Sequence, residues 1–228
     1  MIFSPRNKPA TDQNIFINNE KITRVKETKF LGVILDQGLS WKQHIFYIKN
    51  KIAKTTGIMY KARQKLGRRY LITLYNTLVL PYLSYCNIIW CSTYESYLKP
   101  LIIMQKKVLR CVCNLKAKTS TPLYFKSTSI LKLTDINQFQ IMNFMFNYQK
   151  GNLPDIFQSF FKYNHEIHSY STRQSNLFRP PNYKTLLGKM FIKYKGVIIW
   201  NSLTKHVSAD STRFIFKKQL KTYFISSY

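Results

Sequence analysis

The sequence predicts a mainly α-helical protein in which a helical bundle follows a small N-terminal β-hairpin. Apolar residues recur at helical spacing within 41–66, 94–115 and 135–149. Strand-like runs bounded by turn residues are confined to the first 38 residues. The 228 residues are 45% hydrophobic and include only 7 glycines and 8 prolines, so the chain can bury a core and is neither a low-complexity nor a fibrous protein.

The region 1–38 is expected to contain short strands. MIFS at its start fits the end of a strand, and IFINNEKI fits two short strands around a turn at Asn18 and Asn19. KFLGVILD is a nearly continuous apolar run and fits one buried strand. Its glycine, Gly32, would leave room for another backbone to approach closely.

The next region, 39–150, is expected to be a helical bundle. Ser40 fits the N-cap of its first helix, with Gln43 as the capping-box partner. This helix would cover 41–66 and end at Gly67. Its apolar face consists of Trp41, Ile45, Ile48, Ile52, Met59 and Leu66.

Further helices are expected along the chain. The apolar spacing predicts one over 94–115 and an aromatic-rich one over 135–149. Residues 151–187 include a polar stretch with two adjacent prolines and no period, which is typical of a linker or an irregular segment. Residues 188–228 would then form a C-terminal pair of helices.

The segment 70–94 carries no charged residue, and it is long enough to span a bilayer, which takes about 20 residues. It also contains several polar residues and Pro81, whereas real spans are more apolar. A buried helix over 70–90, kinked at Pro81, is therefore favoured. A single-span or membrane-surface basic protein is the alternative.

Charge is the most unusual property of the sequence. It has 36 Lys and Arg residues against 9 Asp and Glu residues, a net charge of +27, and the cations are spread along the chain. Such a body repels itself unless a polyanion neutralises it. Nucleic acid is the first candidate and an anionic membrane surface the second. The 16 Tyr and 16 Phe residues fit base stacking, but they fit a helical core equally well.

The basic side of the helix over 41–66 is either a solvated face or a phosphate-binding surface. Phosphate contact is favoured because there are few acids to pair with and because the helix over 94–115 repeats the pattern. The side chains predicted to contact phosphates are Lys42, Lys49, Lys51, Lys54, Lys61, Lys65, Arg68 and Arg69, with Lys106, Lys107 and Arg110 as a second group.

The sequence shows no local signature of a catalytic or metal site. No two of its acids lie within five residues of each other, whereas two-metal phosphoryl chemistry needs clustered carboxylates. The cysteines are spaced C-x4-C and C-x-C on predicted helices, which does not match zinc-site spacing, so free thiols are expected. The start of the chain has no signal-peptide pattern, so an intracellular location, nucleus or cytoplasm, is expected.

Five stretches in the right order resemble the reverse transcriptases of non-LTR, LINE-type and jockey-like retrotransposons, in the region after the catalytic strands. These are KFLGVILDQGLSWKQHI, LITLYNTLVLPYLSYCNIIWCST, LKPLIIMQKKVLRCVCN, KYKGVIIWNSL and STRFIFKKQLKTYF. Together they extend over most of the chain.

The resemblance implies a role for each region. It makes 1–38 the end of the palm domain with a hairpin that holds the primer end, and it places Phe30, Leu31 and Gly32 in that primer-grip-like hairpin. It makes 39–150 a helical thumb that grips the template–primer duplex through its backbone. RNA or an RNA–DNA duplex is the implied partner.

The resemblance also implies what lies elsewhere. The family's aromatic-x-Asp-Asp strand, which belongs to the Mg²⁺-dependent site of the full enzyme, is expected before residue 1. The chain is therefore expected to have no cofactor of its own, not to be an enzyme, and to have a palm-containing polymerase as a further partner. A decayed open reading frame without function is the remaining alternative.

Overall fold

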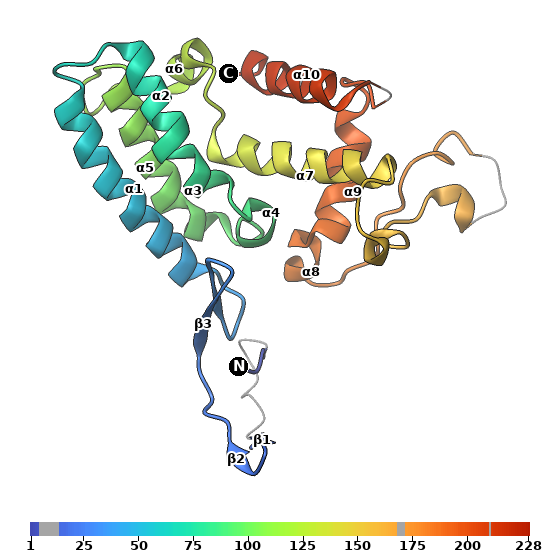
Figure 1. Ribbon diagram of the computed structural model, residues 1–228. Helices are drawn as coiled ribbons and strands as arrows, with labels where there is room; N and C mark the ends of the chain where they lie inside the picture. The colour runs from blue at the N-terminus through green and yellow to red at the C-terminus, as the bar shows by residue number, and fades with distance from the viewer. Residues whose placement is uncertain (5–13, 168–171, 210) are drawn as a thin grey trace.

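The computed structural model describes residues 1–4, 14–167, 172–209 and 211–228. These ranges hold ten α-helices and two antiparallel two-stranded hairpins. The predicted mainly α-helical fold with a small N-terminal hairpin is therefore confirmed. In Figure 1 the helices form two neighbouring groups, and the hairpins project away from the first group at the start of α1.

The first hairpin lies where the sequence predicts it. Strand β1 (Phe16–Ile17) pairs with β2 (Glu20–Lys21). The turn residues Asn18 and Asn19 have φ angles of 49° and 65°, as a tight two-residue hairpin turn requires. Residues 1–4 form no strand, so the prediction from MIFS is wrong, because they pair with none of the described strands.

The second hairpin corrects the prediction of a single buried strand over KFLGVILD. Strand β3 (Glu27–Phe30) ends at Phe30, and β4 (Val33–Asp36) returns antiparallel beside it. Leu31 and Gly32 form the turn with φ angles of 44° and 84°. The sequence does not distinguish one strand from a hairpin here, because leucine rarely occupies the left-handed position of a turn.

The first long helix, α1 (Lys42–Ala62), starts differently from the prediction. Ser40 is not its N-cap, since the helix begins after Trp41, which has a φ angle of 63° and makes no capping bond. Instead the Asp36 carboxylate accepts hydrogen bonds from the amides of Ser40 and Trp41, both at 2.9 Å. The helix ends at Ala62 rather than at Leu66, which is exposed.

The uncharged segment forms three helices rather than one kinked helix. These are α2 (Arg68–Leu78), α3 (Leu80–Ser84) and α4 (Asn87–Trp90). Pro81, which has no amide hydrogen, lies in the first turn of α3. Cys86, with a φ angle of 49°, separates α3 from α4. Among the described helices, none is long and apolar enough to cross a membrane.

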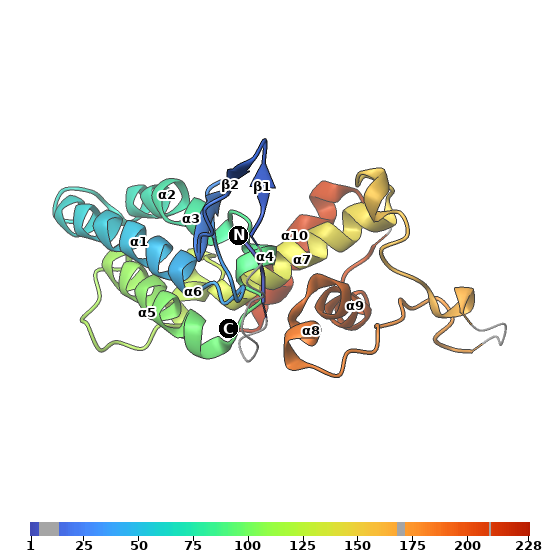
Figure 2. The same ribbon diagram turned by 90° about the horizontal axis from the view of Figure 1, so that it is seen from below.

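Helix α5 (Glu95–Val112) completes the first group and lies along α1, as Figures 1 and 2 show. The Thr93 hydroxyl donates to the Ser40 carbonyl at 3.0 Å, so the starts of α1 and α5 lie together. The predicted apolar faces of both helices are buried against each other and against α2 and α3. Their fully buried members include Ile52, Met59, Leu101, Val108 and Leu109.

The second group of helices forms around a separate core. After the short α6 (Pro122–Thr128), helix α7 (Leu133–Gln149) runs from the first group into the second (Figures 1 and 2). It packs there against α9 (Ile192–Leu203) and α10 (Arg213–Ser226). The short α8 (Leu186–Met190) precedes α9 and contacts it. Two hydrophobic cores therefore share one helix.

The described part of the predicted linker 151–187 is irregular up to Thr185 and is packed, and its last two residues begin α8. It contains two short 3₁₀ turns, Asp155–Phe157 and Asn164–Glu166. Phe161 and Phe178 are buried in the second core. The part of the predicted linker at 168–171 lies outside the described residues.

The chain returns to the first core at Tyr228. Its ring meets the Phe125 ring edge-on with 6.1 Å between centroids. Its hydroxyl donates to the Asp135 carboxylate and accepts from the Lys132 amide at 3.0 Å. Burial and the hydrogen bond to Asp135 raise the pKa of Tyr228 well above its usual value.

A buried glutamine, Gln105, joins α5 to the start of α7. Its side-chain nitrogen donates to the Tyr75 hydroxyl and to the Leu131 carbonyl, each at 2.9 Å. Its side-chain oxygen accepts from the Leu133 amide at 2.9 Å. Only 1% of Gln105 is exposed, so water could not take over its hydrogen bonds to these partners.

Replacing Gln105 by leucine should destabilise the protein by roughly 2–4 kcal/mol, because the Leu133 amide and the Leu131 carbonyl would stay buried without partners. Urea denaturation followed by circular dichroism measures this change. The matched control is Gln219→Leu on the exposed side of α10, which should change stability by less than about 0.5 kcal/mol. Equal effects of the two substitutions would contradict the structural role of Gln105.

Candidate nucleic-acid interface

The predicted phosphate-binding residues lie on the first group of helices. Five of them belong to α1, Lys65 lies in the turn after it, Arg68 and Arg69 begin α2, and the last three belong to α5. Nine of these eleven side chains are exposed, and Lys49 and Arg110 are half-buried. The predicted residues are thus brought onto one part of the fold.

The lysines of α1 do not form a single row. At about 100° per residue, Lys54 and Lys61 lie opposite the buried face of the helix. Lys42 and Lys49 lie on one flank, and Lys51 lies on the other. The positive charge therefore surrounds the exposed part of α1.

Helix α5 does carry a row of cations. Lys106 and Arg110 are four residues apart, and Lys99 lies seven residues before Lys106, so the three share one side of the helix. Lys99 is exposed and was not among the predicted residues, although its spacing gives the signal. The Arg110 side chain also donates to the Thr119 carbonyl at 2.9 Å and so holds the loop after α5.

The cations nearest the hairpins lie over aromatic rings rather than beside carboxylates. The Lys42 ammonium is 4.5 Å from the centre of the Tyr97 ring, and the Lys51 ammonium is 5.5 Å from that of Tyr47. Such contacts are weak at exposed sites, at about 0.5–1 kcal/mol. They position the ammonium groups without neutralising them.

The outward cations have no acidic partner within the described part of the chain. This holds for the side chains of Lys54, Lys61, Lys65, Arg69, Lys106 and Lys107, for which no hydrogen bond or ion pair is found there. Arg68 donates to the Ser127 hydroxyl at 2.8 Å, which leaves its charge in place. These residues of α1, α2 and α5 form what is called the basic surface below. Its positive charge is thus not balanced by acidic side chains of the described residues.

The primer-grip-like residues form the tip of the β3–β4 hairpin. Phe30 and Leu31 are 63% and 74% exposed. The Tyr85 hydroxyl donates to the Leu31 carbonyl at 2.7 Å, and a Cβ atom at Gly32 would lie 3.5 Å from the Tyr85 ring. The close approach expected at Gly32 is therefore made by a side chain, not by another backbone.

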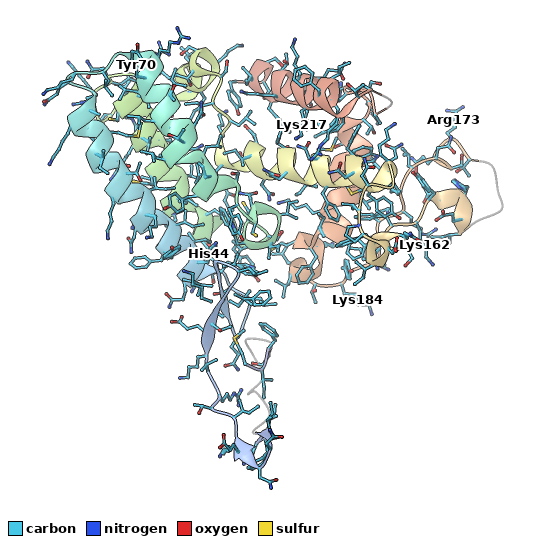
Figure 3. All side chains as sticks on the ribbon, viewed as in Figure 1. His44, Tyr70, Lys162, Arg173, Lys184 and Lys217 are labelled. Carbon is cyan, nitrogen blue, oxygen red and sulfur yellow. The ribbon has the colours of Figure 1, made fainter. Side chains whose placement is uncertain are left out.

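His44 connects this hairpin to the bundle and was missed by the sequence reasoning. The Ile34 amide donates to His44 Nδ1 at 3.3 Å, and the imidazole packs edge-on against the Trp90 ring. Figure 3 shows it where the hairpin meets α1. Burial lowers the pKa of His44 from 6.5 to about 4, so the ring is neutral at physiological pH.

The described thiols and carboxylates do not form a metal site. Among the described residues, no three His, Cys, Asp or Glu side chains come together as a group that could hold a metal ion. All four cysteines are free thiols. Burial raises the pKa of Cys91 to about 12 and also raises the pKa values of Cys111 and Cys113, which makes these three thiols poor metal ligands.

Comparison with known proteins identifies relatives of about half of the chain. One, from Drosophila melanogaster, is named "Probable RNA-directed DNA polymerase from transposon X-element" and is 26% identical over 108 residues, 46% of this chain. Another, from Drosophila funebris, is named "RNA-directed DNA polymerase from mobile element jockey" and is 27% identical over 120 residues, 51% of this chain. No family model and no solved structure matches.

The resemblance to non-LTR retrotransposon reverse transcriptases is confirmed. The prediction that the chain is not an enzyme is wrong, because both of these reverse-transcriptase relatives are named as polymerases, which are enzymes. That prediction relied on missing catalytic motifs, but the match covers about 12% of each relative's length. A stretch this short does not define the activity of the whole protein.

The His44 environment predicts a loss of stability in acid. Because the folded-state pKa of about 4 lies below the unfolded value of 6.5, folding favours the neutral ring. This contribution, up to ~3 kcal/mol, is fully present above about pH 6.5 and is lost as the pH falls toward 4. Protonation would place a hydrogen on Nδ1, where the Ile34 amide now donates.

The measurement is the free energy of unfolding in urea between pH 4 and 7.5. His44→Asn, which keeps a hydrogen-bond acceptor near the position of Nδ1, should flatten the dependence between pH 6.5 and 4. The control His206→Asn, at an exposed position, should keep it. An unchanged profile in His44→Asn would show that another group causes the acid sensitivity.

Proposed function

We propose that this chain is the part of a non-LTR retrotransposon RNA-directed DNA polymerase that binds template–primer nucleic acid. Its partner would be RNA or an RNA–DNA duplex, held through the phosphate backbone by the basic surface of α1, α2 and α5. The observation that carries the proposal is the lack of acidic partners for the outward cations in the described part of the chain. The names of the relatives support it.

The chemistry of the basic surface favours sequence-tolerant binding. Its members are mostly lysines, whose ammonium groups act as point charges toward phosphates. Binding of phosphates by lysine and arginine releases condensed counterions, so affinity depends steeply on salt concentration. Because phosphate contacts carry no direct sequence information, the surface suits a polymerase that must move along any template.

The hairpin tip suits a contact with the primer end. Phe30 and Leu31 expose apolar surface on a narrow two-stranded projection, and Leu31 adopts a left-handed φ angle, which costs free energy. The Tyr85 hydroxyl holds the tip in place. A palm domain of the polymerase is a further partner in this proposal, beside the hairpin.

Other functions are less well supported. No described helix is long and apolar enough to cross a membrane. The proposed partner is present in the nucleus and in the cytoplasm, and both compartments agree with the proposal.

The proposal predicts a specific change in salt dependence. Substitution of Lys54, Lys61 and Lys65 by glutamine should make the plot of log K against log salt concentration less steep. For a B-DNA duplex the slope falls by about 0.9 for each phosphate that the variant no longer neutralises. The measurement is fluorescence anisotropy of a labelled RNA–DNA duplex at several salt concentrations.

The control carries the same change of charge at Lys205, Lys218 and Lys221, which are exposed in the second group of helices. This control should leave the slope close to that of the parent chain. The proposal fails if binding of the parent is independent of salt, or if both triple variants lower the slope equally.

A further inference from the structure

A second positively charged site lies outside the basic surface, in the segment that the sequence predicts to be a linker. It is a cavity of about 250 Å³ between residues 159–162, Ile167, residues 179–182 and Lys193 of α9. Its wall includes Lys162, Arg179 and Lys193, and no described acidic residue lines it. In Figure 3, Lys162 lies on the opposite side of the molecule from α1.

The backbone brings these cations together from three parts of the chain. The Arg179 amide donates to the Lys162 carbonyl at 2.8 Å, next to the bridge between Tyr163 and Phe178. Lys193 comes from the first turn of α9, and its ammonium lies 5.1 Å from the centre of the Phe160 ring. Buried Phe161 and Phe178 anchor this arrangement to the second core.

The charge and shape of the cavity point to one kind of ligand. Cationic side chains from three positions line one cavity, and an anion inside it is attracted to each of them. The rest of the wall includes Phe160, Pro180 and Pro181, which offer apolar faces to a flat group. Pockets for drug-sized ligands measure roughly 300–1,000 Å³, so this smaller cavity suits a single nucleotide unit.

We infer that this cavity binds one nucleotide of a single-stranded nucleic acid, with its phosphate among Lys162, Arg179 and Lys193 and its base or sugar against Phe160. Cations combined with aromatic faces are the usual means of binding single strands. A duplex keeps its bases stacked and paired, so it has no free base to enter the cavity. The site therefore differs from the basic surface in both position and ligand.

The test uses the full chain and two labelled probes, a short single-stranded oligonucleotide and an RNA–DNA duplex. The double variant Lys162→Gln, Lys193→Gln should weaken single-strand binding by roughly tenfold and leave duplex binding unchanged. The control is Lys184→Gln, Lys189→Gln, which removes two exposed neighbouring charges that do not line the cavity. It should leave both affinities close to those of the parent.

A second variant separates stacking from charge. Phe160→Leu keeps an apolar side chain beside Phe157 and Phe161 but removes the aromatic face, so single-strand binding should fall while the unfolding temperature changes little. A nucleoside monophosphate should compete with the single strand at concentrations where inorganic phosphate does not.

Three results would overturn the inference. The double variant could lose no more single-strand affinity than its control, it could lose single-strand and duplex affinity equally, or inorganic phosphate could compete as well as the nucleotide. The proposed function is tested by substitutions in the basic surface and by the binding of a duplex. A failure of the cavity and a failure of the proposed function are therefore distinguishable.

Discussion

The fold depends on helix α7, which both hydrophobic cores bury. Leu133 and Ile136 near its start pack into the first core, whereas Ile141, Met145 and Phe146 pack into the second. The basic surface lies on the helices of the first core, and the cavity around Lys162 and Lys193 lies beside the second. Their relative position is thus set by α7, together with the return of the chain to the first core at Tyr228.

Polar contacts of Asn137, in the second turn of α7, fix how the two cores meet. Asn137 donates to the Asn87 side chain at 2.8 Å and accepts from the Lys195 ammonium at 2.6 Å. Burial lowers the pKa of Lys195, so the charged form costs free energy that these hydrogen bonds partly offset. Hydrogen bonds are directional, whereas apolar side chains can slide past one another, and this network therefore selects one arrangement.

The sequence predicts the parts of the fold that depend on periodicity and on common turn residues. The helices α1, α5 and α7 follow from their apolar spacing, and the first hairpin follows from its two asparagines. The positions that it does not predict depend on unusual backbone angles. Leu31, Trp41 and Cys86 adopt positive φ angles, and tertiary contacts rather than residue preference hold them there.

The candidate sites also differ in how far the sequence predicts them. The exposed cations could be chosen from the sequence because charge and helical spacing are local properties, and Lys99 could have been added on the same grounds. His44 and the cavity around Lys162 and Lys193 could not be predicted. Each depends on residues distant in the chain that meet only after packing, such as Ile34 with His44 and Arg179 with Lys162.

The spread of lysines around α1 has a kinetic consequence for the proposed function. A single row would hold a duplex in one position, and all its contacts would have to break before the duplex moved. Lysines on three sides allow a phosphate to pass from one ammonium group to the next while the others remain engaged. In the proposed function, a bound duplex would then move over many small barriers instead of one large one, which would favour movement of the duplex over its release.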